Sequence, residues 1–340
     1  MWTRRKIIAR TGVGALAALA LPMARDVAAQ GAINDRLAGD VSPVHDPCII
    51  KAGDTYHLFC TSQMSENKGL IHWRTSPDLL TWTFKGAVMQ AFPDWVMKAV
   101  PQTRGAWAPD ISFVNGRYLL YYAASIFGQN TSVIGLMTTP TLDTAHPDFA
   151  WTDEGLVIAT TVHDDYNAID PNHVVDAGGR HWLAMGSFWT GLKLVELDPA
   201  THKPKAGAQL VSLARRRAPD AVEGAFIIRK GDWYYLFASY DFCCRGVNST
   251  YYTVACRSRD VTGPYVDRDG HKMTNDGGFL VLHADLDPQK RFKGPGHCAI
   301  LREGDTDYIV YHAYDAQNNG RPTLRIQKLA WTADGWPVAV

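Results

Sequence analysis

The hydrophobic and polar positions of this 340-residue chain follow one pattern that recurs five times. In each copy a polar residue precedes an apolar run of strand length, a turn containing glycine follows, and a second run rich in aromatic residues completes the unit. The five copies begin at Asp46, Asp110, Asp170, Glu223 and His297. Short apolar runs bounded by turn residues are typical of β-strands, so each copy predicts two strands joined by a turn.

The spacing of the copies distinguishes between repeat architectures. They recur at intervals of about 50 to 75 residues, which favours the blades of a β-propeller over the shorter units of a solenoid. No stretch after the N-terminal segment has sustained helical periodicity. We therefore predict an all-β fold, a five-bladed β-propeller that forms a single domain over residues 44–340. The pattern does not indicate how the ring closes.

In a propeller the first strand of each blade lines the central channel, so equivalent positions on the blades converge on one axis. The residues that begin the five copies would then meet at the mouth of this channel, although they are far apart in sequence. Four of them are acidic and the fifth is a histidine, a set that five arbitrary strand starts would seldom provide. The pattern therefore indicates a functional site at the channel.

The N-terminal segment does not share the repeat. A basic start, Arg4-Arg5-Lys6, precedes a short apolar run from Gly14 to Leu21, and the small residues Val27-Ala28-Ala29 precede Gln30. This order is typical of a secretory signal, and the paired arginines favour the twin-arginine route. We predict a signal at residues 1–29 and an extended connector at 30–43, so that the protein is periplasmic or extracellular. A retained N-terminal anchor is the alternative.

Composition limits the partners of the protein. Its 34 basic and 34 acidic residues give a formal net charge of zero, whereas nucleic-acid binding would need a basic excess. We expect a monomer with no nucleic-acid partner and no stable membrane anchor. The eleven tryptophans and fourteen tyrosines offer faces that can stack on sugar rings, although most should pack between blades.

Six cysteines in an exported chain could form disulfides. Cys48 and Cys60 fall on adjacent predicted strands and could face each other. Cys243 and Cys244 are neighbours in sequence, where a bridge would be strained. A chain with 46% hydrophobic residues does not require disulfides for its core, so the redox state of the cysteines stays open.

Acids on different blades suit glycoside hydrolysis. An inverting reaction needs a carboxylate that activates water and a carboxylic acid that protonates the departing oxygen, with roughly 6.5–9.5 Å between them. A third carboxylate would raise the pKa of the acid by charge repulsion and keep it protonated near neutral pH. Asp46, Asp170 and Glu223 meet these three needs. The alternative is that acids at strand starts only cap loops or accept hydrogen bonds from backbone amides.

Seven short segments strengthen this interpretation. They read Val44-His-Asp-Pro, Gly105-Ala-Trp-Ala-Pro-Asp, Ala168-Ile-Asp-Pro-Asn, Gly186-Ser-Phe-Trp-Thr-Gly, Val222-Glu-Gly-Ala, Asp241-Phe-Cys-Cys-Arg-Gly and Gly294-Pro-Gly-His. From Val44 to the C-terminal strand, the chain resembles the endo-arabinanases of glycoside hydrolase family 43. The segments that begin at Gly186 and Asp241 favour this branch over the xylosidases and arabinofuranosidases of the family.

The resemblance implies a five-bladed propeller and an inverting hydrolase that cleaves internal α-1,5 bonds of arabinan, a side chain of pectin. By position, it implies that Asp46 is the general base, Glu223 the general acid, and Asp170 the carboxylate that tunes the acid. The further positions that match substrate contacts are His45, Trp107, Phe127, Asn172 and Ser187. Two alternatives stay open: an exo-acting arabinofuranosidase or xylosidase on the same scaffold, and a non-catalytic carbohydrate-binding propeller.

The resemblance also implies a role for His297. A histidine at this place approaches a calcium or sodium ion in the central channel, with water completing the ion's ligands because hard cations prefer oxygen. Such an ion would act on the carboxylates through its charge. The alternative is that His297 is a structural residue with its ring nitrogens satisfied by the protein.

Overall fold

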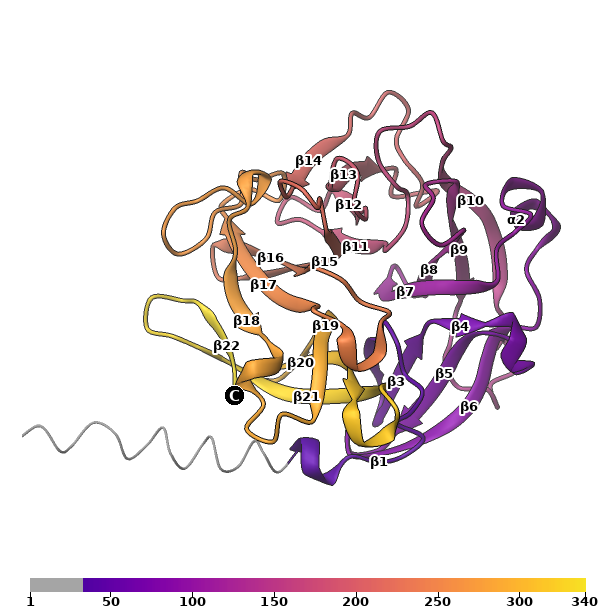
Figure 1. Cartoon of the computed structure of the whole chain (residues 1–340). Coiled ribbons are helices and arrows are strands. Elements are labelled where there is room, and N and C mark those ends of the chain that lie inside the picture. Colours follow the sequence, from indigo (N-terminus) through magenta and orange to yellow (C-terminus); the bar gives the residue numbers. More distant parts are fainter. Residues whose placement is uncertain (1–32) are drawn as a thin grey trace, which may run out of the picture.

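The computed structural model describes residues 33–340. Its strands form five sheets around a central axis, as the blades of a propeller (Figure 1). The predicted all-β, five-bladed, single-domain fold is confirmed. The predicted signal lies outside the described residues, and within residues 33–340 no helix has the length and apolar character needed to cross a membrane.

Each blade is an antiparallel sheet of four successive strands, and the first strand lies nearest the axis. Blade 1 contains β2 (Cys48–Ala52), β3 (Thr55–Cys60), β5 (Leu70–Ser76) and β6 (Thr81–Met89). Blade 2 contains β7 (Gly105–Val114), β8 (Arg117–Ser125), β9 (Ser132–Thr139) and β10 (Thr152–Thr160). Blade 3 contains β11 (Asn172–Val175), β12 (His181–Met185), β13 (Leu192–Leu197) and β14 (Val211–Ala214).

Blade 4 contains β15 (Val222–Lys230), β16 (Trp233–Tyr240), β17 (Tyr252–Ser258) and β18 (Phe279–Leu282), and blade 5 contains β19 (Phe292–Glu303), β20 (Thr306–Asp315), β21 (Arg321–Trp331) and β22 (Pro337–Ala339). Two short strands extend these sheets: β1 (Ala38–Gly39) pairs with β6, and β4 (Ser62–Gln63) pairs with β7. A short helix, α2 (Asp94–Ala99), connects blade 1 to blade 2.

The core lies between adjacent blades. Strand β9 is buried along its whole length and β8 along most of it, because neighbouring elements cover both faces of the sheet. This double burial explains why the sequence shows continuous apolar runs rather than an alternating pattern. Leu58, Leu120 and Val310 belong to one apolar cluster, which joins three blades across the ring.

Residues 33–44 pack along the junction between blades 1 and 5. Asn34 Oδ1 accepts a hydrogen bond from the backbone N–H of Ile326 (2.8 Å), and Val41 O accepts one from Leu324 (2.9 Å). The N–H of Val44 in turn donates to Pro322 O (3.0 Å). The prediction of an extended connector was wrong at residues 33–36, which are helical; the reason is that this segment docks on both end blades instead of crossing solvent.

Candidate active site

A residue with left-handed backbone conformation stands on the axial side of every blade. These residues and their φ angles are Asp46 (50°), Ala108 (40°), Asp170 (56°), Gly224 (63°) and His297 (49°). Positive φ is uncommon outside glycine, and it occurs here where the inner strands begin or carry bulges, as the register shifts of β7, β15 and β19 show. The conformation turns the chain at this point, and it brings the five positions to one end of the channel.

The positions of the left-handed residues show that the predicted alignment was wrong in blades 2 and 4. The equivalent of Asp46 in blade 2 is Ala108, not Asp110, which lies two residues further along β7. Glu223 directly precedes the equivalent position, which Gly224 occupies. The sequence holds a signal for the first correction, because Ala108-Pro109 matches Asp46-Pro47 and the corresponding dipeptide of blade 3.

Asp110 therefore has a different environment from the other predicted acids. It is 4% exposed and accepts hydrogen bonds from Asn172 Nδ2 (3.2 Å) and the backbone N–H of His173 (2.8 Å). Burial raises its pKa to about 6, against the effect of these bonds. Asn172 Oδ1 accepts from the N–H of Ile227 (2.8 Å). The Asp110–Asn172 pair thus ties the inner strands of blades 2, 3 and 4 together.

Four of the left-handed residues donate their backbone N–H to a side chain of the preceding blade in the ring. The pairs, acceptor first, are Thr61 Oγ1 with Ala108 (2.8 Å), Ser239 Oγ with His297 (2.8 Å), His312 Nδ1 with Asp46 (3.1 Å) and Asp170 Oδ2 with Gly224 (3.2 Å). Because a buried N–H without a partner is costly, these bonds stabilise the unusual backbone.

Three of these acceptors occupy the same place in their blades. Thr61 stands 15 residues after Asp46, and Ser239 and His312 have the same offset from Gly224 and His297. Met185 occupies the corresponding position of blade 3, and its thioether sulfur is only a weak acceptor. The carboxylate of Asp170 accepts the hydrogen bond instead, so this acid fixes the backbone next to Glu223.

Asp46 is surrounded by hydrogen-bond donors. Its Oδ2 accepts from Thr61 Oγ1 (2.6 Å) and lies 2.8 Å from His45 Nδ1, and its Oδ1 lies 3.2 Å from His297 Nδ1. Burial alone would raise the pKa of Asp46, but the charges of His45 and His297 and the hydrogen bond from His45 lower it strongly. Asp46 is therefore held as a carboxylate, the form that a general base requires.

A chain of hydrogen bonds through His312, Tyr314 and His45 orients the Asp46 carboxylate. His312 is buried, which lowers its pKa well below the usual value and keeps the ring neutral. Its Nδ1 accepts from Asp46 N, so its proton lies on Nε2, 3.3 Å from Tyr314 Oη. Tyr314 Oη also accepts from Cys244 N (2.8 Å) and lies 2.7 Å from Nε2 of His45. Burial alone would lower the pKa of His45, but the charge of Asp46 and the hydrogen bond to it raise that pKa. His45 Nδ1 then carries the proton that Asp46 Oδ2 accepts.

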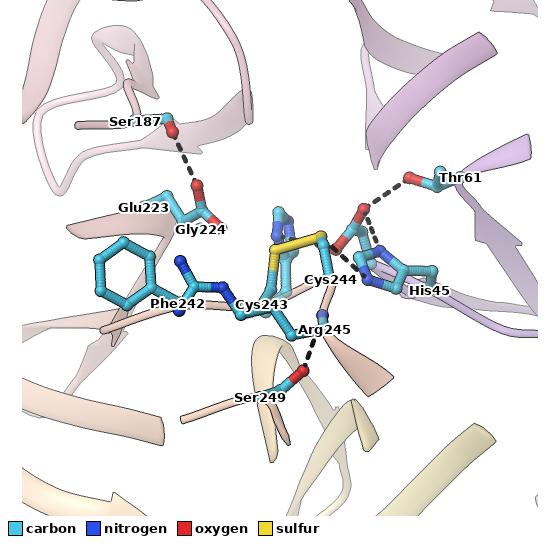
Figure 2. The surroundings of a disulfide bond; sticks show 12 residues. His45, Thr61, Ser187, Glu223, Gly224, Phe242, Cys243, Cys244, Arg245 and Ser249 are labelled. Atoms are coloured by element: carbon cyan, nitrogen blue, oxygen red, sulfur yellow. Dashed lines mark hydrogen bonds and ion pairs between the residues drawn. A yellow bond between two sulfur atoms is a disulfide. The ribbon is translucent and has the colours of Figure 1, made fainter. Parts of the chain in front are cut away.

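Glu223 and Asp170 lie on the opposite side of the site. Ser187 Oγ donates to Glu223 Oε2 (2.7 Å) (Figure 2). Burial first, then repulsion from Glu223 and Asp46, raises the pKa of Asp170 well above its ordinary value. The three carboxyl groups therefore interact electrostatically. Their environments keep Asp46 ionised, whereas Asp170 beside Glu223 resists ionisation. Such a separation is typical of sites that use one carboxyl group as base and another as acid.

The remaining predicted substrate residues are placed differently. His45 and Ser187 contact the catalytic candidates, as described above. Trp107 lies in β7 next to the left-handed Ala108 and is half-buried, and Phe127 follows β8 and is 76% exposed. Asn172 is 3% exposed and faces Asp110 rather than the three acids. Thr61, His312 and Tyr314 were not predicted; the shared 15-residue offset would have found the first two.

His297 offers one ring nitrogen for an ion. Its Nδ1 faces Asp46 Oδ1, and within residues 33–340 no protein group bonds to its Nε2. A histidine that donates one N–H to a carboxylate and presents its other nitrogen has the usual arrangement of a metal ligand. None of the groups of three adjacent protein ligands in the described chain includes His297. The residues therefore fit a cation whose other ligands are mainly water.

We expect the Asp170→Asn variant to have a lower rate and an altered pH dependence. Two neighbouring carboxyl groups repel each other when both are ionised, which keeps one proton on the Asp170–Glu223 pair; with Asp170 replaced this repulsion is gone, so Glu223 loses its proton at lower pH. The basic limb of the pH–rate profile should therefore move to lower pH. The apparent pKa values belong to the pair as a whole. A profile of kcat/KM against pH tests this, and an unchanged basic limb with nearly normal activity would exclude the tuning role.

The sequence of the chain is similar to those of known proteins. The sequence profile of the glycosyl hydrolases family 43 matches residues 41–337. The chain belongs to glycosyl hydrolases family 43. The family resemblance of the sequence motifs is thereby confirmed, and the chain is a glycoside hydrolase of this family.

Family 43 relatives of this chain have names that describe related activities. The extracellular endo-α-(1→5)-L-arabinanase 1 of Bacillus subtilis (strain 168) is 40% identical over 295 residues, which cover 86% of this chain and 87% of that protein. The extracellular exo-α-(1→5)-L-arabinofuranosidase of Cellvibrio japonicus (strain Ueda107) is 39% identical over 306 residues, 86% of this chain and 85% of that protein. The solved structure of an endo-arabinanase from Bacillus licheniformis has a TM-score of 0.81 and 42% identity, and covers 89% of this chain and 99% of that chain.

Proposed function

We propose that this family 43 hydrolase cleaves internal α-1,5-L-arabinofuranosidic bonds of arabinan with inversion of configuration. The observation that carries the proposal is the contrast between Asp46, whose pKa is strongly lowered, and Asp170, whose pKa is raised beside Glu223. Asp46 Oδ1 accepts a proton from water as the water attacks the anomeric carbon. Glu223 donates a proton to the departing sugar oxygen, and the mutual repulsion of the Asp170 and Glu223 carboxyl groups keeps one proton on this pair.

The endo-acting mode rests on similarity to relatives that carry this name. A relative of nearly equal identity is named as exo-acting, so an exo-acting arabinofuranosidase is the second candidate. A non-catalytic carbohydrate-binding propeller is less favoured, because such a protein has no need of an ionised carboxylate held by His45 and His297. Sugar binding without turnover would favour it.

The first products of linear arabinan test the proposal. We expect a ladder of oligosaccharides early in the digestion, since an endo-acting enzyme cuts between internal residues, and NMR of the first turnovers should show the inverted anomer. Chromatography separates the ladder from the single monosaccharide that an exo-acting enzyme releases from the start. Initial retention of configuration would exclude Asp46 as a base that activates water directly.

The proposal includes export of the chain to meet a polysaccharide. Its support is the pattern of the first 29 residues, together with relatives that are named as extracellular. The proposed twin-arginine route can be tested by replacing Arg4 and Arg5 with lysine, after which the protein should accumulate inside the cell.

We propose further that a hydrated calcium or sodium ion binds Nε2 of His297. When bound, the ion would supply positive charge near the carboxylates. Asp46 keeps the His297 ring oriented by accepting from its Nδ1. Chelation should lower the melting temperature or the activity, and adding metal back should restore it. We expect His297→Ala to lower activity while the protein stays folded. A fully active alanine variant would leave His297 with a structural role only.

A further inference from the structure

Cys243 and Cys244 form a disulfide between adjacent residues, in the loop between β16 and the 3-10 helix η2 (Gly246–Asn248). The four other cysteines, Cys48, Cys60, Cys256 and Cys298, are buried free thiols. Cys244 is exposed and Cys243 is half-buried. Because the bridge closes a loop of only two residues, it cannot join distant parts of the chain as stabilising disulfides do. Its role must be local.

The disulfide lies at the active site. Cys244 Sγ is 3.8 Å from His45 Nε2, and the N–H of Cys244 donates to Tyr314 Oη (2.8 Å). Figure 2 shows the S–S bond between Glu223 on one side and His45 on the other. Ser249 Oγ accepts from the N–H of Arg245 (3.1 Å) and holds the following turn in place. The sulfur atoms are therefore fixed beside the residues that perform the reaction.

The disulfide is apolar, whereas the active-site side chains around it are polar. Asp46, Glu223 and His45 present charged or polar groups, whereas the S–S bond carries no charge and has only weak hydrogen-bonding capacity. The ring of Phe242, the residue before the bridge, packs 5.9 Å from that of Phe188, and the guanidinium of Arg245, the residue after it, lies 4.1 Å from the Phe242 centroid, so both flanking side chains are fixed. A rigid apolar wall next to a polar site suits the C–H face of a sugar ring, which has few hydrogen-bonding groups.

We propose that the Cys243–Cys244 disulfide is a sugar-binding subsite, on which the C–H face of an arabinofuranose unit of the substrate packs. This subsite rests on the proposed arabinan specificity. It makes the bridge a determinant of substrate binding rather than a stabiliser of the fold. It also explains why an exposed disulfide occurs in a chain whose remaining cysteines are buried and reduced.

The test combines a Cys243→Ser/Cys244→Ser variant with two measurements. In the otherwise wild-type enzyme, KM for linear arabinan should rise about fivefold to tenfold while kcat stays within about twofold, as expected for the loss of ~50 Å² of apolar contact. In an inactive Glu223→Ala background, calorimetry should show the same rise in Kd for α-1,5-linked arabinohexaose. Val247→Ser is the matched control, since Val247 lies in the adjacent helix η2 with 44% exposure, and KM should stay unchanged.

The outcomes distinguish a disulfide that contacts the substrate from one that only positions the residues around Asp46. Lower kcat with unchanged KM and Kd would mean that the bridge acts only through Tyr314 and His45, and would overturn the proposal, as would no change at all. If the double variant is unfolded by its melting curve, wild-type enzyme reduced with a phosphine is measured instead, with the same expected rise in Kd. A wild-type enzyme that does not degrade arabinan would refute the proposed function, independently of the comparison between variants.

Discussion

The Glu223→Ala variant should lose about 10²–10⁴-fold of its activity on arabinan, because the departing sugar hydroxyl is a poor leaving group that needs a proton from a general acid. On an arabino-oligosaccharide with an activated aryl leaving group the same variant should lose much less, since such a group departs with little protonation. The measurement is kcat/KM for both substrates with wild type and variant.

Comparing two substrates on one protein removes the contribution of general damage to the fold. Ser187 donates to Glu223 in the native site, and its hydroxyl can turn to water when the carboxylate is absent. Equal losses on both substrates would show that Glu223 is not the acid. Asp170 would then be the next candidate, because its raised pKa also favours the protonated form.

The Asp46→Asn variant should lose activity to a similar extent, about 10²–10⁴-fold, but equally on both substrates. Water must be activated whichever group departs, so a better leaving group cannot replace the base. Asparagine has the shape of aspartate and can still accept from Thr61, yet it cannot take a proton from water. Measurement of kcat/KM with arabinan and with the aryl substrate tests this prediction against the opposite result expected for Glu223.

Asp110→Asn is the matched control for this substitution. Asp110 is also a buried carboxylate near the axis, but it accepts hydrogen bonds from Asn172 and His173 instead of facing His45 and His297. The variant should be less stable, because an amide next to Asn172 places two N–H groups together, while the folded protein keeps its turnover. A loss of turnover as large as that of Asp46→Asn would contradict the separate roles assigned to these two residues.

The sequence by itself determined the architecture and selected three acids as catalytic candidates. Five copies of the pattern, each with two runs joined by a turn, specify ten strands at the correct places, because strands buried on both faces need continuous apolar sequence. The positions of Asp46, Asp170 and Glu223 within family motifs were enough to select three carboxylates from 34 acidic residues. The short motifs also identified the family.

Tertiary structure decided what surrounds those acids. A left-handed residue at each inner strand moves the alignment by one or two positions, so Ala108 and not Asp110 is the counterpart of Asp46. The hydrophobic pattern alone does not reveal such a shift, because bulges change the register without changing that pattern; the proline that follows Ala108 is the sequence signal that does. The partners of Asp46 come from blades 1 and 5, up to 266 residues apart. Their contact, and the exposure of the Cys243–Cys244 bridge beside them, exist only because the ring closes and brings the two ends of the chain together.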